Sequence, residues 1–172
     1  MSCLFLSTIR LHSIINEKSR INLKLNDLHE QLMDIQNYSA TIANGSVTMN
    51  DVANAPASIF SRLMNFVNYS TSTSMQGAQT MFSQFSAMGQ MPTFADAASQ
   101  MNYQNSLFQG FYKQQMDQCI KVEQQLLNAK ETKIQQEINK LQTRLSMLES
   151  EQNSCESAQQ QSAQKSGPNY MA

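Results

Sequence analysis

Charged side chains are almost absent from the middle of this chain. Between Gly45 and Tyr112 only Asp51, Arg62 and Asp96 are charged, whereas the rest of the chain's 12 basic and 13 acidic residues lie in the flanking segments. Charges favour a solvated helix face and oppose burial, so this contrast predicts exposed arms around a covered centre. We divide the chain into residues 1–44, an N-terminal heptad helix; 45–112, a charge-poor helical centre; 113–155, a C-terminal heptad helix; and 156–172, a disordered tail.

The N-terminal segment repeats apolar residues in alternating steps of three and four. The stripe has twelve positions, and nine of them are Leu or Ile. A sustained spacing of this kind predicts that a partner helix packs against the stripe. Charges of both signs flank the stripe, with Arg20 and Lys24 beside acids one turn away. Asn44-Gly45 predicts the end of the helix. The stripe consists of Leu4, Ser7, Leu11, Ile14, Lys18, Ile21, Leu25, Leu28, Leu32, Ile35, Ser39 and Ile42.

The first half of the centre contains two signals for helix starts. Residues Thr48 to Asp51 resemble a capping signal. A second start is predicted at Asn54-Ala55-Pro56, with Pro in the first turn, where its missing N–H is harmless. A polar run from Tyr69 to Ser74 separates the helix that follows from the next helical stretch.

The second half of the centre predicts one helix end and one helix start. The stretch after Ser74 ends near Gly89 and Pro92, and Thr93 to Asp96 predicts the next start. We expect that last helix to continue through Gly110 into the C-terminal arm.

The C-terminal arm carries a second stripe with the same alternation, flanked again by both signs of charge. Two polar positions interrupt it, Gln124 and Glu131, which lower stability but can set register. From about Asn153 the residues are chiefly Ser, Gln, Ala and Asn, a composition that predicts fraying or disorder. The stripe consists of Ile120, Gln124, Leu127, Glu131, Ile134, Ile138, Leu141, Leu145, Leu148, Gln152 and Cys155.

Together these patterns predict an all-α fold. The long N- and C-terminal helices form an antiparallel coiled coil or helical bundle, with shorter helices in the middle. Only five Gly and three Pro are available for turns, which argues against a protein of many short strands. The stripes alone leave open whether the two arms pair within one chain or between chains.

Composition excludes several classes of protein. A net charge of −1 provides no positive field for nucleic acid. No window holds the 18 to 20 or so apolar residues of a membrane-spanning helix. The apolar run from Cys3 to Leu6 is too short for a secretory signal, and no Lys or Arg precedes it. The three cysteines form no CxxC pair, which indicates reduced thiols and a cytoplasmic protein, with a redox or intermolecular role as the alternative.

No residues are spaced for catalysis, a cofactor or a metal. His12 and His29 flank the first stripe and read as solvated histidines, and Cys119 has no cation on its own helix face. The twelve Met residues suit core or interface packing, with a metal site or a deformable surface as the alternatives. Met88 and Met91 are the only MxxM pair. We therefore predict no catalytic residue, no cofactor and no bound metal.

Candidate interaction residues come from the two stripes and the aromatic centre. We expect them to be covered by the chain's own arms, by other copies or by another helical protein. They are Leu11, Ile14, Ile21, Leu25, Leu28, Leu32, Ile35, Phe60, Phe82, Phe85, Phe108, Leu127, Ile134, Ile138, Leu141, Leu145 and Leu148.

Two functions remain at this stage. The first is a non-enzymatic structural or interaction protein that forms homo-oligomers, or binds another helical protein, through coiled-coil helices. The second rests on organisation: the chain resembles flagellin-type and type III secretion filament or translocator proteins, which bring terminal helices together around a variable middle and lack a cleaved signal. That resemblance implies secretion by a signal-less route and engagement of an assembly or a membrane.

Overall fold

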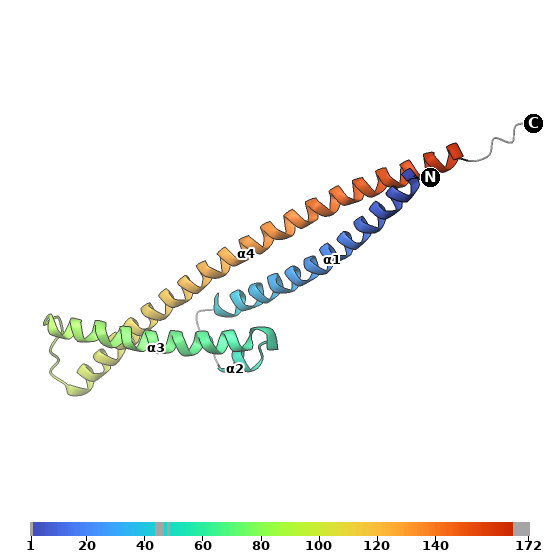
Figure 1. Cartoon of the computed structure of the whole chain (residues 1–172). Helices are drawn as coiled ribbons and strands as arrows, with labels where there is room; N and C mark the ends of the chain where they lie inside the picture. The colour runs from blue at the N-terminus through green and yellow to red at the C-terminus, as the bar shows by residue number, and fades with distance from the viewer. Residues whose placement is uncertain (1, 44–46, 48, 167–172) are drawn as a thin grey trace, which may run out of the picture. The chain divides into compact units, whose positions relative to one another are not determined.

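A computed structural model of the chain describes residues 2–43, 47 and 49–166. These residues form four helices and no strand, so the predicted all-α class is confirmed (Figure 1). The long terminal helices α1 and α4 pack against each other, with shorter helices between them in the sequence. The helices are α1 (Ser2–Ala43), α2 (Met49–Ala53), α3 (Ala57–Ala87) and α4 (Ala97–Ser166).

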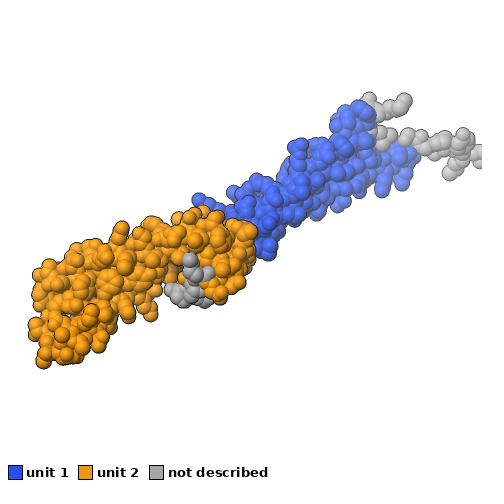
Figure 2. All heavy atoms as spheres, turned by 90° about the horizontal axis from the view of Figure 1, so that it is seen from below, with its two compact units in different colours: residues 1–33, 132–172 blue, residues 34–131 orange. Residues whose placement is uncertain are grey.

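The chain divides into two compact units, coloured separately in Figure 2. Unit 1 consists of residues 1–33 and 132–172, and unit 2 of residues 34–131. The division therefore crosses both long helices, whereas the sequence suggested boundaries at the change in charge density. Each unit has its own core.

Unit 1 is built from the first part of α1 and the last part of α4. Its core consists of Ile14, Ile21, Leu25, Leu28, Ile138 and Leu148, all buried, with Leu32, Ile134, Leu141, Leu145 and Cys155 packed against them. We call this set the seam core. All of its members lie on the two stripes identified in the sequence, so the heptad spacing correctly located the faces that meet.

Unit 2 combines the end of α1, α2, α3 and the first part of α4. Its buried side chains are Ile35, Tyr38, Ile42, Val52, Ile59, Leu63, Phe66, Ser70, Ser74, Ala78, Ile120 and Leu127. Tyr38 is buried although the stripe was expected to pass through Ser39. The buried face of α1 has shifted here because α3 lies against it as well, as the edge-to-face contact of Tyr38 with Phe66 shows.

Helix α3 continues through the Ser/Thr run that we expected to separate two helices. Ser70 and Ser74 are buried within it. The Ser70 hydroxyl donates to the carbonyl of Val67 in the preceding turn, and Thr80 and Ser83 donate to carbonyls four residues earlier. Hydroxyls that bond to their own helix need no other partner, so they are compatible with a continuous helix.

Most predicted helix ends are confirmed. Helix α1 ends at Ala43, immediately before Asn44-Gly45, and α3 ends at Ala87. Gly89 closes α3 with a positive φ of 67°, a conformation that glycine adopts without strain. The predicted start at Thr48 lies outside the described residues. Pro56 is the residue before α3 and not part of its first turn, and its carbonyl accepts from the amides of Ile59 and Phe60.

The C-terminal helix extends further than the sequence suggested. Residues up to Ser166 are helical, although we placed the start of a disordered tail at 156. Neither Gly nor Pro occurs in α4 beyond Gly110, and Gln, Glu and Ala favour helix. The amide of Gln152 also donates to Glu156, one turn on. The remainder of the predicted tail, 167–172, lies outside the described residues.

Helices α3 and α4 approach closely at Gly77. A Cβ at this position would lie 2.9 Å from Cγ and Cδ of Gln115. Ala is favoured over Gly in a helix by about 1 kcal/mol, but here Gln115 must first move away from its hydrogen bond to the Met81 sulfur. We therefore expect the effect of Gly77→Ala on the free energy of unfolding to depend on Gln115. In a Gln115→Ala variant it should be about 1 kcal/mol more favourable than in the natural chain, as measured by urea unfolding. Equal effects in both backgrounds would contradict the close contact.

Asp96 caps the start of α4. Its carboxylate accepts from the amide and the hydroxyl of Ser99, and the amide hydrogen bond chiefly holds the pKa of Asp96 below its usual value. A lowered pKa means that the cap is complete above about pH 4 and is lost as the pH falls further. The thermal midpoint of the natural chain should therefore fall in acid, and that of Asp96→Asn should fall less over the same pH range. An unchanged acid dependence would show that the cap contributes nothing.

Candidate interaction surfaces

The predicted interaction residues of the arms are mostly used inside the chain. Those in unit 1 fill the seam core, apart from the half-buried Leu11, and those in unit 2, Ile35 and Leu127, are buried. In this structure the two arms of one chain pack against each other. Any further association must use other surfaces.

Three ion pairs flank the seam core and follow its heptad spacing. Arg10 pairs with Glu151, Glu17 with Arg144 at 2.9 Å, and Lys24 with Glu137 at 2.6 Å. Each step of seven residues forward in α1 matches a step of seven backward in α4, so the two helices run antiparallel here. We call these three pairs the ion-pair ladder. It replaces the pairing within α1 that we expected for Lys24.

The signs along the ion-pair ladder alternate, and this alternation defines the register. Sliding α4 by one heptad would bring Arg144 opposite Arg10 or Lys24, and Glu17 opposite Glu137 or Glu151. Like charges across a seam are destabilising. All six side chains are substantially exposed, so solvent screens each pair and each contributes little to stability. The ladder therefore selects the register, and the seam core supplies most of the stability.

A charge swap tests the ion-pair ladder. Glu17→Lys should lower the free energy of unfolding slightly because it places two cations together, and adding Arg144→Glu should restore most of the loss. Both effects should shrink at high salt. Arg20 is exposed on the same helix and forms no ion pair within the described part of the chain, so Arg20→Glu is the control. A double variant no more stable than Glu17→Lys would contradict the pairing.

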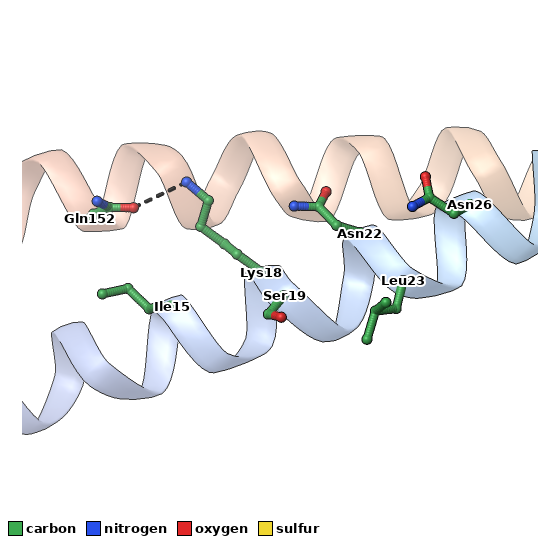
Figure 3. A pocket seen from close by; sticks show the side chains of 7 residues that line it. All are labelled: Ile15, Lys18, Ser19, Asn22, Leu23, Asn26 and Gln152. Carbon is green, nitrogen blue, oxygen red and sulfur yellow. Dashed lines mark hydrogen bonds between the residues drawn. The ribbon is translucent and has the colours of Figure 1, made fainter.

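An open groove runs beside α1 in unit 1 (Figure 3). Lys18, which occupies a seam position, extends its ammonium across to α4 and donates to Gln152 Oε1 at 3.1 Å. Glu149 lies 3.6 Å from the same ammonium. The lining residues are Ile15, Lys18, Ser19, Asn22, Leu23, Asn26 and Gln152, which are chiefly neutral.

A polar cluster joins three helices in unit 2. Arg62 of α3 pairs with Glu123 of α4 at 2.8 Å, and its guanidinium lies 4.5 Å from the ring centre of Tyr38 in α1. Burial raises the pKa of the Tyr38 hydroxyl, and the nearby Glu123 carboxylate raises it further, so the phenol stays protonated. The hydroxyl lies close to the Glu123 carboxylate and the Arg62 guanidinium, but it has the geometry of a hydrogen bond with neither of them, nor with any other described residue. The cluster therefore links α1, α3 and α4 within unit 2.

The predicted aromatic residues of the centre meet different surroundings. Phe82 packs edge to face on Phe108, and Phe85 packs similarly on Phe111, so these rings join α3 to α4. Phe60 is 43% exposed. Two aromatic contacts thus cover three of the four residues, and Phe60 is left on the surface.

A cavity of about 370 Å³ lies between α3 and α4 in unit 2. Its wall is largely apolar, with Phe66, Met116 and Ile120 among its residues, and Lys113 and Asp117 also line it. Lys113 and Asp117 are one helical turn apart, the usual spacing of a surface charge pair. The cavity is therefore chiefly apolar, with one pair of charged residues in its wall.

Residues that could hold a metal do not gather in the described part of the chain. No group of three or more His, Cys, Asp or Glu side chains converges there. His12 and His29 are exposed on α1, and Cys119 and Cys155 are free thiols.

No helix in the described ranges combines the length and apolar character that crossing a membrane requires.

Sequence reasoning missed the cluster of Tyr38, Arg62 and Glu123. A signal was present in Arg62, the one cation between Gly45 and Tyr112, which stands beside the predicted buried Leu63. A lone charge next to a buried stripe indicates a partner on another helix. The partner's identity depends on which helices meet, and the stripe pattern alone does not contain that information.

Comparison with known proteins gives no relative for this chain. No family model matches it, and neither the curated proteins nor the solved structures include a significant match.

Proposed function

We propose that the protein is a non-enzymatic structural protein that acts by helical association, with itself or with another helical protein. The observation that carries the proposal is the apolar surface that remains after the seam core is filled. On α1 alone, Phe5, Leu6, Ile9, Ile15 and Leu23 are exposed although the opposite side of the helix is buried against α4. Exposed apolar groups in this number are typical of surfaces that meet a partner.

The arrangement of polar groups supports the same proposal. The ion-pair ladder and the Tyr38, Arg62 and Glu123 cluster both connect helices to one another. Such features fix the geometry of a scaffold, and rigid scaffolds present surfaces with little loss of conformational entropy on binding. The free thiols of Cys119 and Cys155 support a cytoplasmic location.

Sedimentation velocity of the full chain over a wide concentration range tests self-association. We expect the mean mass to rise with concentration to that of a dimer or a larger oligomer. A chain that remains monomeric at high concentration would contradict self-assembly and restrict the proposal to association with a different helical protein.

The second candidate is a filament- or translocator-like protein secreted by a signal-less route. The packing of α1 against α4, with shorter helices between them in the sequence, favours it, since that is the organisation of such proteins. Detection of the protein in culture supernatant without cell lysis, together with binding of the full chain to liposomes, is the expected result. Absence of both would exclude this candidate.

A further inference from the structure

The cavity between α3 and α4 in unit 2 has an apolar floor and a charged mouth. Phe66 and Ile120 line it and are only 8% and 7% exposed, so they form its deepest part. Met116 is half-buried and extends the apolar wall, whereas Lys113 and Asp117 are exposed and lie at the mouth. The volume of about 370 Å³ is in the lower part of the range of small-molecule sites.

The two charged groups at the mouth are available to a ligand. Lys113 and Asp117 form no ion pair or hydrogen bond with each other or with any other described residue. They are four residues apart on α4, which separates them by about 6 Å along the helix axis. The other charge pair between these helices, Arg62 with Glu123, is already joined at 2.8 Å.

The presence of both signs restricts the kind of molecule that fits. A molecule with only an anionic group would pair with Lys113 but would bring its charge close to Asp117, and an amine would meet the reverse situation. A wholly apolar molecule would cover both charges and give them no partner. A zwitterionic head presents one opposite charge to each of them, while an apolar body fills the floor of the cavity.

We infer that this cavity binds a small amphipathic molecule. Its apolar chain or ring is enclosed by α3 and α4, and its zwitterionic head pairs with Lys113 and Asp117. Free apolar amino acids and single-chain zwitterionic lipids share this chemistry, whereas the two acyl chains of a phospholipid are too large for the volume. The inference goes beyond the proposed function and does not depend on self-association, because the site lies within unit 2 of one chain.

Isothermal titration calorimetry of the full chain tests the choice of head. Dodecylphosphocholine, dodecanoate and dodecylamine carry the same apolar chain and differ in the charge of the head, and each is used below the concentration at which it forms micelles. We expect dodecylphosphocholine to bind about tenfold more tightly than the other two. L-Phenylalanine tests the amino-acid source. Binding of either zwitterion supports the inference, and the tighter of the two identifies the source.

A cavity-filling variant shows whether the molecule binds at this place. Thr71 is an exposed residue of α3 in the cavity wall, so Thr71→Trp should fill the mouth and weaken zwitterion binding about tenfold or more, with the helical circular dichroism unchanged. Thr80 is exposed on the same helix and does not line the cavity, so Thr80→Trp is the matched control and should bind as the natural chain does.

A charge variant distinguishes recognition of the head from a structural effect. Asp117→Asn should weaken dodecylphosphocholine binding and strengthen dodecanoate binding, each about threefold to tenfold, because the anion then meets Lys113 without a neighbouring carboxylate. A structural role of Asp117 would shift the two affinities in the same direction.

The outcomes separate the inference from the proposed function. The inference is overturned if neither zwitterion binds, if the three dodecyl molecules bind equally well, or if Thr71→Trp binds as tightly as the natural chain. If Thr71→Trp abolishes self-association and no zwitterion binds, the cavity receives a helix of a second copy, so the inference fails while the proposed function stands. A natural chain that is monomeric yet binds a zwitterion at this cavity gives the opposite result for each.

Discussion

Replacing Arg62 with Met should lower the free energy of unfolding by about 2 to 3 kcal/mol. Met keeps the apolar stem, so the change removes chiefly the guanidinium. Without it, Glu123 is left as a largely covered charge with no partner, and the ring of Tyr38 loses the cation above it. The pair is partly exposed, which places the loss below the 3 to 5 kcal/mol or so that breaking a fully buried pair causes. Urea unfolding followed by helical circular dichroism measures it.

Two further variants show whether charge or packing is responsible. Adding Glu123→Leu to Arg62→Met should recover most of the loss, because no unpaired charge then remains. Tyr38→Phe should be neutral or slightly stabilising, since the buried hydroxyl has no hydrogen-bond partner within the described residues and the ring stays in place. A large loss in Tyr38→Phe, or no recovery in the double variant, would contradict this account of the cluster.

The seam could be predicted because its information is local. Residues such as Ile14, Ile21 and Leu25 recur at the helical period, and a stripe of this kind is buried whichever partner covers it. The stripes do not determine the register of α4 against α1. The alternating charges of the ion-pair ladder encode it, but only after α1 and α4 are known to run antiparallel.

Unit 2 was less predictable because its contacts join residues distant in the sequence. The shift of the buried face from Ser39 to Tyr38 depends on α3 lying against α1, and a stripe analysis of α1 alone has no access to that contact. The continuity of α3 through Ser70 and Ser74 has a similar cause. Their low helix propensity is outweighed by tertiary packing, because small side chains let α4 come close.

Replacing Ile21 with Ala should lower the free energy of unfolding by about 2 to 4 kcal/mol. Ile21 is 7% exposed and belongs to the seam core, so its truncation removes apolar burial and leaves a cavity between α1 and α4. Leu23 lies two residues further on the same helix and is 64% exposed, and Leu23→Ala should change stability by no more than about 0.5 kcal/mol. Urea unfolding of both variants makes the comparison.

The concentration dependence of the same experiment identifies which chain supplies the other half of the seam. If α1 pairs with α4 of the same chain, the urea midpoint of the Ile21→Ala variant does not depend on protein concentration. Its difference from the midpoint of the natural chain is then independent of concentration as well. When the arms of two chains pair, dilution lowers both midpoints, because unfolding is then coupled to dissociation. A concentration-dependent Ile21→Ala effect would contradict the intrachain seam, because association through another surface shifts the midpoints of both proteins alike.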